Sequence, residues 1–397
     1  MNVKEDVVIV GAARTPQGRM MGQLASVSAV ELGGVAIAAA LDRAGISADA
    51  VDAVVMGHVI QAGAGQNPAR QAAVAGGIPL SAHAVTVNKV CLSGLSAIIE
   101  ASRLLQLGEA EVAIAGGQES MSNAPHLLPG SRAGHLYGDA VLTDALARDG
   151  LTDAFDHESM GLNTDRANDV LGIRRAEQDK AAADSHRRAA AAQGAGYFDA
   201  EIVPVKVPRR RGAPELAGSD EGVRPDSNEE SLTKLRPAFS PAGTVTAGNA
   251  SPLTDGAAAV VLTTRGYAEA HGLDVVGVLG AHGQIAGPDT SLPDKPAQAI
   301  AKALGVADWT AGELDFVEIN EAFASVALHS AAQLGIGMER VNVNGGAIAL
   351  GHPIGASGAR VVVSAVYELQ RRGGGKAAVA LCGGGGQGEA LLLSLSL

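Results

Sequence analysis

Cys91 is the first residue in this chain whose position suggests chemistry. It lies in the segment VNKVCLSGLSAI, where a short strand gives way to an apolar helix. The unpaired N–H groups at a helix N-terminus favour an anion, so a thiolate nucleophile would be stabilised there. The alternative is an inert cysteine packed among apolar neighbours, which is common for this residue type.

A histidine and a second cysteine lie in two glycine-rich turns near the other end of the chain. His352 belongs to NVNGGAIALGHPIGASGAR, where glycines let the backbone pass close to a ligand and Pro353 fixes the turn after the histidine. Cys382 follows a buried strand in LCGGGGQGEA. Taken alone each signal is weak, and core packing is the alternative for Cys382.

Two polar residues, Asn320 and Glu321, come directly after the predicted strand 316–319 and open the segment NEAFASVALHS. Polar residues at the carboxyl end of a strand lie where open α/β sheets place their ligand sites. Asparagine is also a favoured helix N-cap, which is the structural alternative.

The run at 383–388, GGGGQG, matches the pattern GxGxxG. A dinucleotide-binding fingerprint requires a helix and a second strand after it. Only nine residues follow Gly388, so we exclude this interpretation.

Alternating strands and helices must position these residues. The pattern predicts parallel βαβ units, which need such alternation. Strands are expected at 7–10, 51–56, 85–87, 112–115 and 256–262, and helices at 29–44 and 92–107, which end at Gly45 and Gly108.

The stretch 120–248 differs in character, because it is rich in Pro, Asp and Arg and carries few strand signals. It contains one clear helix, at about 175–193. Ordered chains rarely spend so many residues outside regular structure without a functional reason. We therefore interpret it as a long insertion in an α/β domain.

A weak internal repeat relates the two ends of the chain. SGLSAIIEASRLLQLGEAEVAIAGG (93–117) and SGARVVVSAVYELQRRGGGKAAVALCGG (357–384) share a small-residue helix start, an apolar helix, a glycine turn and a buried strand. The segments 35–57 and 298–320 resemble each other in the same sense. Two copies of one α/β unit predict two core domains related by a pseudo-twofold axis, unless the likeness is one that βαβ units share by chance.

Composition excludes some classes of protein and favours others. The net charge of −12 argues against a duplex nucleic-acid binder, which needs a cationic face. With 47% apolar, 18% charged and 3% aromatic residues and 52 glycines, the chain suits tightly packed α/β layers. The basic run 209–211 precedes acidic residues and predicts a solvated loop or, alternatively, a local patch for a ligand phosphate.

Cysteine usage and the N-terminus bear on the compartment. Two cysteines without a CxxC argue against a disulfide framework or a cysteine zinc site and suit a reducing cytoplasm. The start MNVKEDVVIVGAARTP is unlike a signal peptide, and we find no run of ~18 apolar residues. We expect a cytoplasmic protein with no membrane span.

Six motifs, in this order over some 300 residues, carry a resemblance to one family: NKVCLSGLSA, GGQESMS, GNASPLTDGAAA, NEAFA, NGGAIALGHPIGASGAR and CGGGGQG. The sequence resembles the thiolase family along its whole length, and within it the bacterial acetyl-CoA C-acetyltransferases, or acetoacetyl-CoA thiolases. This resemblance implies an α/β thiolase fold with two pseudo-twofold-related α/β/α core domains and an inserted loop domain. The implied division is 1–119 and 249–272 for the N-terminal core domain, 120–248 for the inserted loop domain that binds coenzyme A, and 273–397 for the C-terminal core domain.

The resemblance also implies a role for each candidate residue. Cys91 would be the nucleophile that carries the acyl group, and His352 would take its proton. Cys382 would be the acid/base for the methyl group of the second acetyl-CoA. Asn320 would hold a water that forms one oxyanion hole with His352, while the backbone N–H groups of Cys91 and Gly384 would form the other. The chemistry is coherent, because thioester exchange needs a nucleophile with a nearby base and a developing enolate needs aimed donors.

A site for coenzyme A is implied in the insert and its return, with CoA thioesters as substrates and no metal or bound cofactor. One departure concerns HESMG at 157–161, where many acetoacetyl-CoA thiolases have His in place of Ser159. The binding positions are Leu151, Met160, Arg224, Ala247, Gly248, Ser251, Ala322 and Phe323.

The reaction implied is the reversible conversion of two acetyl-CoA into acetoacetyl-CoA and CoA. A longer-chain 3-ketoacyl-CoA thiolase would use the same residues, but Met160 and the segment 83–90 could wall off a long acyl chain. A decarboxylating ketosynthase pairs its cysteine with two histidines, and Asn320 stands where the second would be. A non-catalytic, lipid-carrying thiolase-like protein would tend to lose catalytic positions, all four of which are present.

Assembly is the last expectation. Thiolases are dimers or tetramers, and the tetramers use a loop in the insert. The stretch 125–144 carries Leu127, Leu128, Leu136 and Tyr137 among glycines, and apolar side chains on a loop tip usually mark an interface. We expect a homotetramer built as a dimer of dimers.

Overall fold

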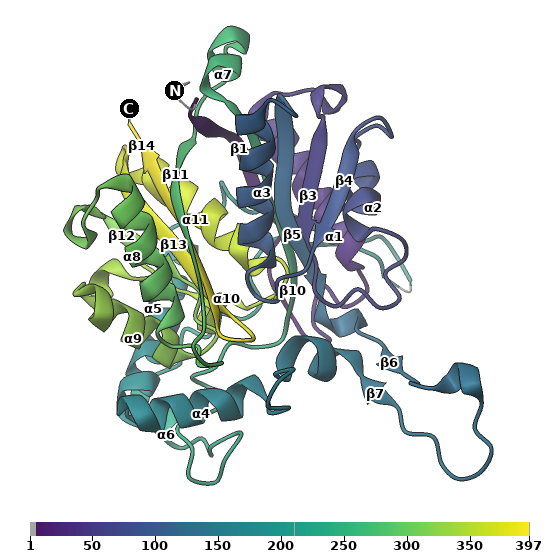
Figure 1. Cartoon of the computed structure of the whole chain (residues 1–397), viewed down its shortest axis with the longest axis vertical. Coiled ribbons are helices and arrows are strands. Elements are labelled where there is room, and N and C mark those ends of the chain that lie inside the picture. The colour runs from purple at the N-terminus through teal and green to yellow at the C-terminus, as the bar shows by residue number, and fades with distance from the viewer. Residues whose placement is uncertain (1–4, 210, 397) are drawn as a thin grey trace.

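The computed structural model describes residues 5–209 and 211–396. Within them, one mixed sheet of ten strands runs through the molecule (Figure 1). Its order is β12-β13-β14-β11-β1-β10-β5-β3-β4, and the short β2 pairs with β10. The strands are β1 (Val7–Arg14), β2 (Gly18–Arg19), β3 (Ala53–Gly57), β4 (His83–Val87), β5 (Val112–Ser120), β10 (Thr254–Thr264), β11 (Gly277–Ala286), β12 (Phe316–Ile319), β13 (Gly375–Gly383) and β14 (Gln387–Leu395).

The two halves of this sheet repeat one arrangement outward from the antiparallel pair β1–β11. Going outward, β10 and β5 correspond to β14 and β13, and β3 corresponds to β12, with the same parallel and antiparallel pairings. The counterpart of the parallel strand β4 is a single parallel bridge between Val317 and Val341. The predicted internal repeat is therefore confirmed, and it describes the whole sheet rather than two segments.

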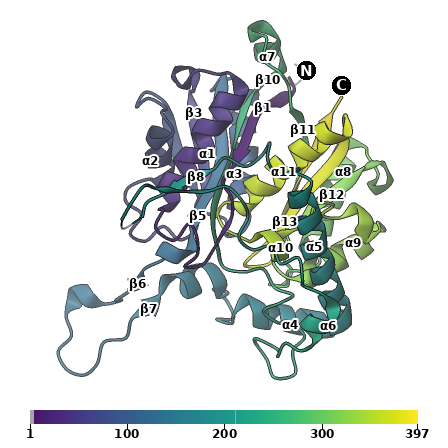
Figure 2. The same ribbon diagram turned by 180° about the vertical axis from the view of Figure 1, so that it is seen from behind.

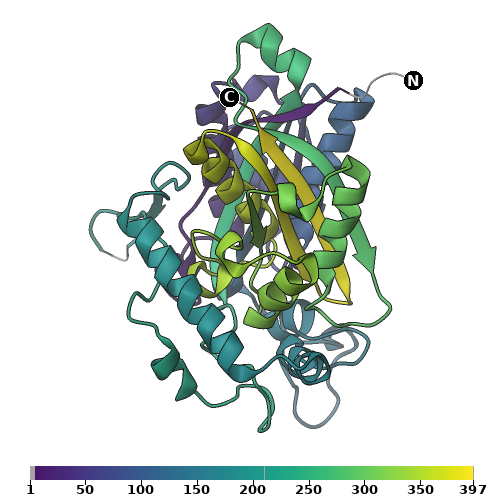
Figure 3. The ribbon, with the colours of Figure 1, turned by 90° about the vertical axis from the view of Figure 1, so that its left-hand side faces the viewer.

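Helices cover both faces of each half (Figures 1 and 3). The central pair, α3 (Ser93–Leu107) and α11 (Ser357–Arg372), lies between the halves, and each helix packs on strands of both. The outer faces carry α1 (Ala29–Ala44) and α2 (Pro68–Ala75) on one half and α8 (Lys295–Ala307) and α9 (Ala324–Leu334) on the other. In β10, Val260 points to the central layer and Val261 to the outer one, so an uninterrupted apolar strand is buried on both sides.

Two strands that were predicted to end at glycines are longer in the structure. The strand expected to end at Gly11 continues to Arg14 with an irregularity in register, and the one expected to end before Gly116 continues to Ser120. A Cβ atom on Gly116 would lie 2.2 Å from the carbonyl oxygen of Ala258 in the neighbouring strand. This glycine therefore serves close packing rather than a turn. By contrast, the predicted ends of α1 and α3 at Gly45 and Gly108 are confirmed, because both glycines adopt the left-handed cap conformation.

The inserted stretch contains more helix than its sequence suggests (Figures 1 and 2). The predicted helix is present as α5 (Arg175–Gly194), but α4 (Met160–Leu171) and α6 (Glu229–Thr233) also form, so the expectation of one helix is wrong. The buried side of α4 includes the polar residues Asn163 and Asn168 and lacks an apolar stripe. Apolar periodicity cannot reveal a helix of this kind.

An arm projects from the body of the molecule between β6 (His126–Leu127) and β7 (Thr143–Asp144) (Figures 1 and 2). Leu136 and Tyr137 at its far end are fully exposed, as expected of an interface in an isolated chain. Leu127 differs from the expectation, because it is half-buried at the base of the arm and packs with Val59 and its neighbours.

Smaller elements complete the chain. Between β8 (Val205–Val207) and β9 (Glu215–Ala217), Arg209 pairs with exposed Glu215, in keeping with a solvated loop, while Arg210 lies outside the described residues. Two short helices, α7 (Arg265–His271) and α10 (Ala347–Leu350), follow β10 and precede His352. The domain boundaries stay predictions.

One segment in the described part of the chain, Val90–Leu107, is long and apolar enough to cross a membrane by composition alone. It is not a continuous apolar run, because it contains Glu100 and Arg103. The segment is essentially α3, which packs against α11 and both halves of the sheet, and the core helix of a folded domain has the same composition.

Candidate active site

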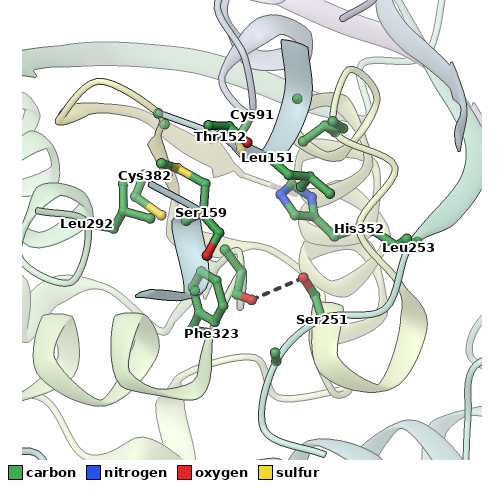
Figure 4. A pocket seen from close by; sticks show the side chains of 18 of the residues that line it. Cys91, Leu151, Thr152, Ser159, Ser251, Leu253, Leu292, Phe323, His352 and Cys382 are labelled. Atoms are coloured by element: carbon green, nitrogen blue, oxygen red, sulfur yellow. Dashed lines mark hydrogen bonds between the residues drawn. The ribbon is translucent and has the colours of Figure 1, made fainter. Parts of the chain in front are cut away.

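Cys91, His352 and Cys382 line one cavity of about 300 Å³, together with Gly384 (Figure 4). They come from the turn before α3, the loop after α10 and the end of β13. Asn320 is fully buried beside this cavity, and its side-chain Nδ2 lies 3.4 Å from each ring nitrogen of His352. The structure thus brings together all five residues that sequence singled out for chemistry.

The turn that presents Cys91 is tight and strained. Ser93 closes it, because its Oγ accepts the N–H of Lys89 at 2.8 Å and donates to the carbonyl of Val90 at 2.6 Å. Val90 has a φ of 50°, a left-handed conformation that β-branched residues rarely adopt. Strain of this kind costs about 1–3 kcal/mol and is found where the geometry of a reacting atom is fixed.

The thiol of Cys91 receives two backbone hydrogen bonds, from the N–H groups of Cys91 and Gly384. Burial nevertheless raises the pKa of this thiol to about 12, against the lowering by the two N–H donors and with a small further rise from the charge of Glu119. The N–H stabilisation of a thiolate that was expected at this turn is present, but desolvation outweighs it, and α3 itself begins only at Ser93. A protonated Cys91 needs a base.

His352 is suited to be that base. Burial, with a smaller contribution from the charge of Arg360, lowers its pKa to about 3, so the imidazole is neutral at physiological pH. Its Nδ1 lies 2.6 Å from Ser357 Oγ, and that hydroxyl donates to the carbonyl of Pro353 at 2.9 Å. A hydroxyl has one proton, so Nδ1 must donate and Nε2 is left as the acceptor. The backbone N–H of His352 is also held, by Thr254 Oγ1 at 3.1 Å.

Asn320 is not a helix cap. The N-cap of α9 is Phe323, and no side chain caps that helix. The backbone N–H of Asn320 donates to Ala380 in the neighbouring strand, which extends the parallel pairing of β12 and β13. Its Oδ1 is buried and has no hydrogen-bond partner among the described residues. The amide is therefore held against His352 by the sheet itself.

Cys382 is fully buried near the end of β13. Strand alternation places its side chain with Ala378 and Ala380 on the outer face, where the cavity reaches it. Burial raises the pKa of this thiol, and the nearby Cys91 raises it further. At neutral pH Cys382 is a protonated thiol that faces the same space as Cys91.

Glycines allow the His352 loop to approach Cys91. A Cβ atom on Gly117 would lie 2.1 Å from the carbonyl oxygen of Gly355, and one on Gly57 would lie 2.6 Å from it. At the start of α11, a Cβ on Gly358 would lie 2.2 Å from the N atom of Leu95 in α3. The loop and α11 therefore rest directly on the backbone of β3, β5 and α3, which no larger residue would permit.

Three further carboxyl and hydroxyl groups hold the site, and sequence reasoning missed them. Glu119 accepts the backbone N–H groups of Gly355 at 2.9 Å and Val59 at 3.0 Å, while Asp153 accepts that of Gly385 at 3.2 Å. The third group is the hydroxyl of Ser357 described above. Glu119 and Ser357 lie inside motifs that carry the family resemblance. The sequence could have indicated them, because they are motif residues to which no role had been assigned.

Five of the predicted coenzyme A positions line the cavity, and three do not. Ser251 is held there by a hydrogen bond from its Oγ to the carbonyl of Ala322 at 3.1 Å (Figure 4). Ser159 lines the cavity as well and caps α4, because its Oγ accepts the N–H of Leu162 at 3.3 Å. The five are Leu151, Met160, Ser251, Ala322 and Phe323, and the three outside the lining are Arg224, Ala247 and Gly248.

A second cavity of about 520 Å³ adjoins the first. Gly150, Thr152, Met160 and Gly384 line both, and the second extends to Val90 and residues nearby. The sulfur of Met160 would lie 3.7 Å from a Cβ on Gly384, so this side chain packs against the turn that carries the oxyanion donor. Met160 is thus part of the wall between the two spaces.

Comparison with known proteins identifies the family of the chain. Residues 7–266 match the family model "Thiolase, N-terminal domain", and residues 273–395 match "Thiolase, C-terminal domain". A probable acetyl-CoA acetyltransferase of Mycolicibacterium smegmatis is 54% identical over 97% of this chain and 100% of its own length. Acetyl-CoA acetyltransferases of Cupriavidus necator (49% identical, 97% of this chain and 98% of the relative) and Pseudomonas aeruginosa (47%, 98% and 99%) are similar over nearly their full length. The chain belongs to the thiolase family and is an acyltransferase with the fold of that family.

Proposed function

We propose that this thiolase catalyses the reversible condensation of two acetyl-CoA molecules to acetoacetyl-CoA and CoA through an acetyl group on Cys91. One observation carries the proposal: the thiol of Cys91 receives N–H donors from Cys91 and Gly384 in a cavity that also contains His352 and Cys382. The names of the similar proteins support acetyl-CoA as the substrate.

In the first half-reaction, His352 Nε2 takes the proton of Cys91 as the sulfur attacks the thioester carbonyl. The carbonyl oxygen becomes negative close to the N–H groups of Cys91 and Gly384, which already point toward the sulfur. Donors fixed before the reaction stabilise such an oxyanion without reorganisation. The C–S bond to CoA then breaks, and the leaving CoA sulfur takes the proton of the Cys382 thiol, so that Cys382 becomes a thiolate while His352 keeps the proton taken from Cys91.

In the second half-reaction, Cys382 as thiolate removes a proton from the methyl group of a second acetyl-CoA. A thiol whose pKa is raised gives a strong base once it is deprotonated. The enolate oxygen is stabilised by His352 and a water held by Asn320. The carbanion attacks the acetyl group, the bond to Cys91 breaks, and the Cys91 sulfur regains its proton from His352, while Cys382 is left as a thiol. These steps assign no role to a metal or bound cofactor, since the CoA thioesters are substrates.

Acyl-chain length separates this proposal from its nearest alternative, a 3-ketoacyl-CoA thiolase for longer chains. Met160 lies between the catalytic cavity and the second cavity, which supports a short-chain enzyme. The same second cavity is the observation that favours the alternative, because a displaced Met160 would open about 520 Å³ to a longer chain.

Steady-state thiolysis of acetoacetyl-CoA, compared with 3-oxohexanoyl-CoA and 3-oxo-octanoyl-CoA, decides between them. We expect kcat/KM to fall with each added pair of methylenes. Efficient thiolysis of 3-oxo-octanoyl-CoA by the unmodified chain would favour the longer-chain enzyme. A lack of turnover with every 3-oxoacyl-CoA, with lipid still bound, would favour a carrier of the thiolase-like type.

We also propose a homotetramer in the cytoplasm. The fully exposed Leu136 and Tyr137 on the projecting arm support an interface there, and two free thiols suit a reducing compartment. Light scattering should give the mass of four chains, and deletion of the arm tip at 129–141 should give two. A dimer that is unaffected by the deletion would reject the tetramer.

A further inference from the structure

Glu389 is a buried carboxylate to which the proposed mechanism gives no task. It is fully buried in β14, where it pairs with Leu381, the residue before Cys382 in β13. Its Oε1 lies 3.0 Å from Nζ of Lys89, which stands two residues before Cys91. One ion pair therefore joins the turn of the first thiol to the hairpin that follows the second.

Further hydrogen bonds hold the Glu389 carboxylate in one position. Its Oε2 accepts the hydroxyl of Ser96 in α3 at 2.5 Å, and its Oε1 accepts the side-chain amide of Gln284 in β11. A buried charge is tolerated only when it is paired and hydrogen-bonded in this way. Among the described residues, no other ion pair connects the segments 88–96 and 382–389.

On the side of the nucleophile, three contacts hold Lys89 next to the strained residue Val90. The backbone N–H of Lys89 donates to Ser93 Oγ at 2.8 Å, and its carbonyl accepts the N–H of Leu92 at 3.1 Å. The third contact is the ion pair with Glu389. Because Val90 keeps a φ of 50°, its relaxation would rotate the next residue, which is the nucleophile. The ion pair opposes that rotation.

On the other side, the donor N–H of Gly384 belongs to a run of four glycines. Gly385 in this run has a φ of 75°, and glycines give such a turn little stiffness of its own. Contact limits how closely the two turns approach, since a Cβ on Gly383 would lie 2.7 Å from Cγ of Leu92. Each packed atom pair attracts only weakly, whereas an ion pair shielded from water attracts strongly. Packing and the ion pair together therefore define the separation of the turns.

We propose that Lys89 and Glu389 are positioning residues, which fix the N–H groups of Cys91 and Gly384 at the separation that receives the oxyanion. The inference rests on the proposed function, because it requires an acyl group on Cys91. Neither Lys89 nor Glu389 lines the catalytic cavity. The charge of each is balanced by the other, so the pair sets geometry and supplies no net charge to the reaction.

The test is single-turnover acetylation of Cys91 by acetyl-CoA, with the stability of each variant measured by urea unfolding. The double variant Lys89→Met/Glu389→Gln leaves no unpaired charge in the interior and keeps a partner for Ser96, so the fold should be retained. We expect acetylation to slow about 10-fold, since a misplacement of ~1 Å can cost ~10²-fold and packing limits the shift. The half-saturating concentration of acetyl-CoA should not change.

Two variants separate geometry from charge. Lys89→Arg keeps a cation for Glu389 and should retain most of the acetylation rate. Glu389→Asp keeps the charge but shortens the side chain by one methylene, so acetylation should slow several-fold although the charges still balance. The matched control Lys376→Met/Glu313→Gln removes a Lys–Glu pair at the opposite end of β13 and should leave acetylation unchanged.

Acetylation at the unmodified rate in both the double variant and Glu389→Asp would overturn the inference. An equal loss in rate constant and in acetyl-CoA saturation would do so as well, because it would indicate a general disturbance of the site. An unmodified chain that forms no acetyl group on Cys91 would reject the proposed function, and the inference with it.

Discussion

The two cysteine turns of the site use one residue type in opposite settings. Cys91 stands in a strained turn before a helix, is partly open to the cavity, and receives N–H groups from Cys91 and Gly384. Cys382 ends a straight strand, is fully buried, and has Cys91 as the neighbour that most opposes its ionisation after burial itself. In both, burial raises the pKa of the thiol.

The difference explains how two cysteine side chains in one cavity can have separate roles. Donors aimed at the Cys91 sulfur would also reach the oxygen of an acyl group on it, so that turn is built to carry an intermediate. Cys382 receives only the backbone N–H of its own residue, and its pKa is raised, which suits proton transfer. The neutral imidazole of His352 can serve the first thiol because both begin uncharged.

Removal of the first thiol is expected to have the largest effect. Cys91→Ser should abolish the acetyl-enzyme and turnover in both directions, because a buried hydroxyl is a far weaker nucleophile than a thiol. Intact-mass measurement after mixing with acetyl-CoA detects the loss. In the unmodified chain iodoacetamide should label Cys91 before Cys382, since Cys91 is the more exposed. Retained activity in Cys91→Ser, with Cys382 labelled first, would reverse the assignment.

The second thiol should matter for one half-reaction only. Cys382→Ser should still accept an acetyl group on Cys91, but condensation should be slower by about 10²–10⁴-fold, the usual effect of losing a general base. Single-turnover acylation and steady-state condensation, measured on the same preparation, separate the two steps. If both steps fail equally, the comparison between the turns is wrong.

The dependence of stability on pH should show that His352 is neutral in the folded chain. The folded-state pKa of His352 is about 3, below the ordinary value near 6.5, so the unfolded chain binds the proton first as the pH falls. Stability from this group is therefore complete above pH 6.5 and is lost toward pH 3, by about 1.4 kcal/mol for each pH unit. In urea unfolding between pH 6.5 and 5, His352→Gln should show a shallower loss than the unmodified chain by this amount. Equal slopes would show that the imidazole is already charged in the fold.

Loss of the Ser357 hydroxyl, which lies next to His352, should slow the reaction less than loss of either thiol. Ser357→Ala removes the acceptor for Nδ1–H, so the imidazole is no longer held with Nε2 free, and we expect acylation of Cys91 to slow by about 10-fold, or ~1.4 kcal/mol, as for one hydrogen bond to a group that becomes charged. Ser357→Thr keeps the hydroxyl and is the matched control. A similar loss in both variants would indicate disturbed packing of α11 rather than the hydrogen bond.

Replacement of Met160, which lies between the two cavities, should have the smallest effect. Met160→Ala opens the second cavity beside Gly384 and should raise kcat/KM for 3-oxohexanoyl-CoA relative to acetoacetyl-CoA. Each methylene buried there is worth ~0.8 kcal/mol, or about 4-fold. Met160→Leu, of similar volume, should leave the ratio unchanged. An unchanged ratio in Met160→Ala would show that this side chain does not limit chain length.

The sequence was most informative where a residue with reactive chemistry lies inside a recognisable motif. The motifs around Cys91, His352, Asn320 and Cys382 lead to one cavity, and the internal repeat anticipates the symmetric order of the sheet. Apolar periodicity located α1 and α3 because each has a distinct buried face and a glycine cap.

The failures arose where tertiary contacts outweigh local signals. The pKa of Cys91 depends on how completely the cavity removes water, which no motif records. The polar buried residues of α4 bond to distant partners; for example, Asn168 Nδ2 donates to Thr244 Oγ1 at 3.1 Å. Likewise, Ser357 gains its role only because the turn after Pro353 brings its hydroxyl back to the imidazole.

The place of β10 in the sheet has a consequence for synthesis on the ribosome. β1 ends at Arg14 and lies between β10 and β11, yet β10 begins only at Thr254. At the usual ~5–20 residues per second, β1 remains without β10 for roughly 12–50 s, and the inner edge of β5 remains without it for roughly 7–29 s. Both strands are apolar on two faces, and unpaired edges of that kind aggregate. The nascent chain is therefore expected to occupy a holding chaperone until about residue 264 has left the exit tunnel, and to need it most when translation is slow.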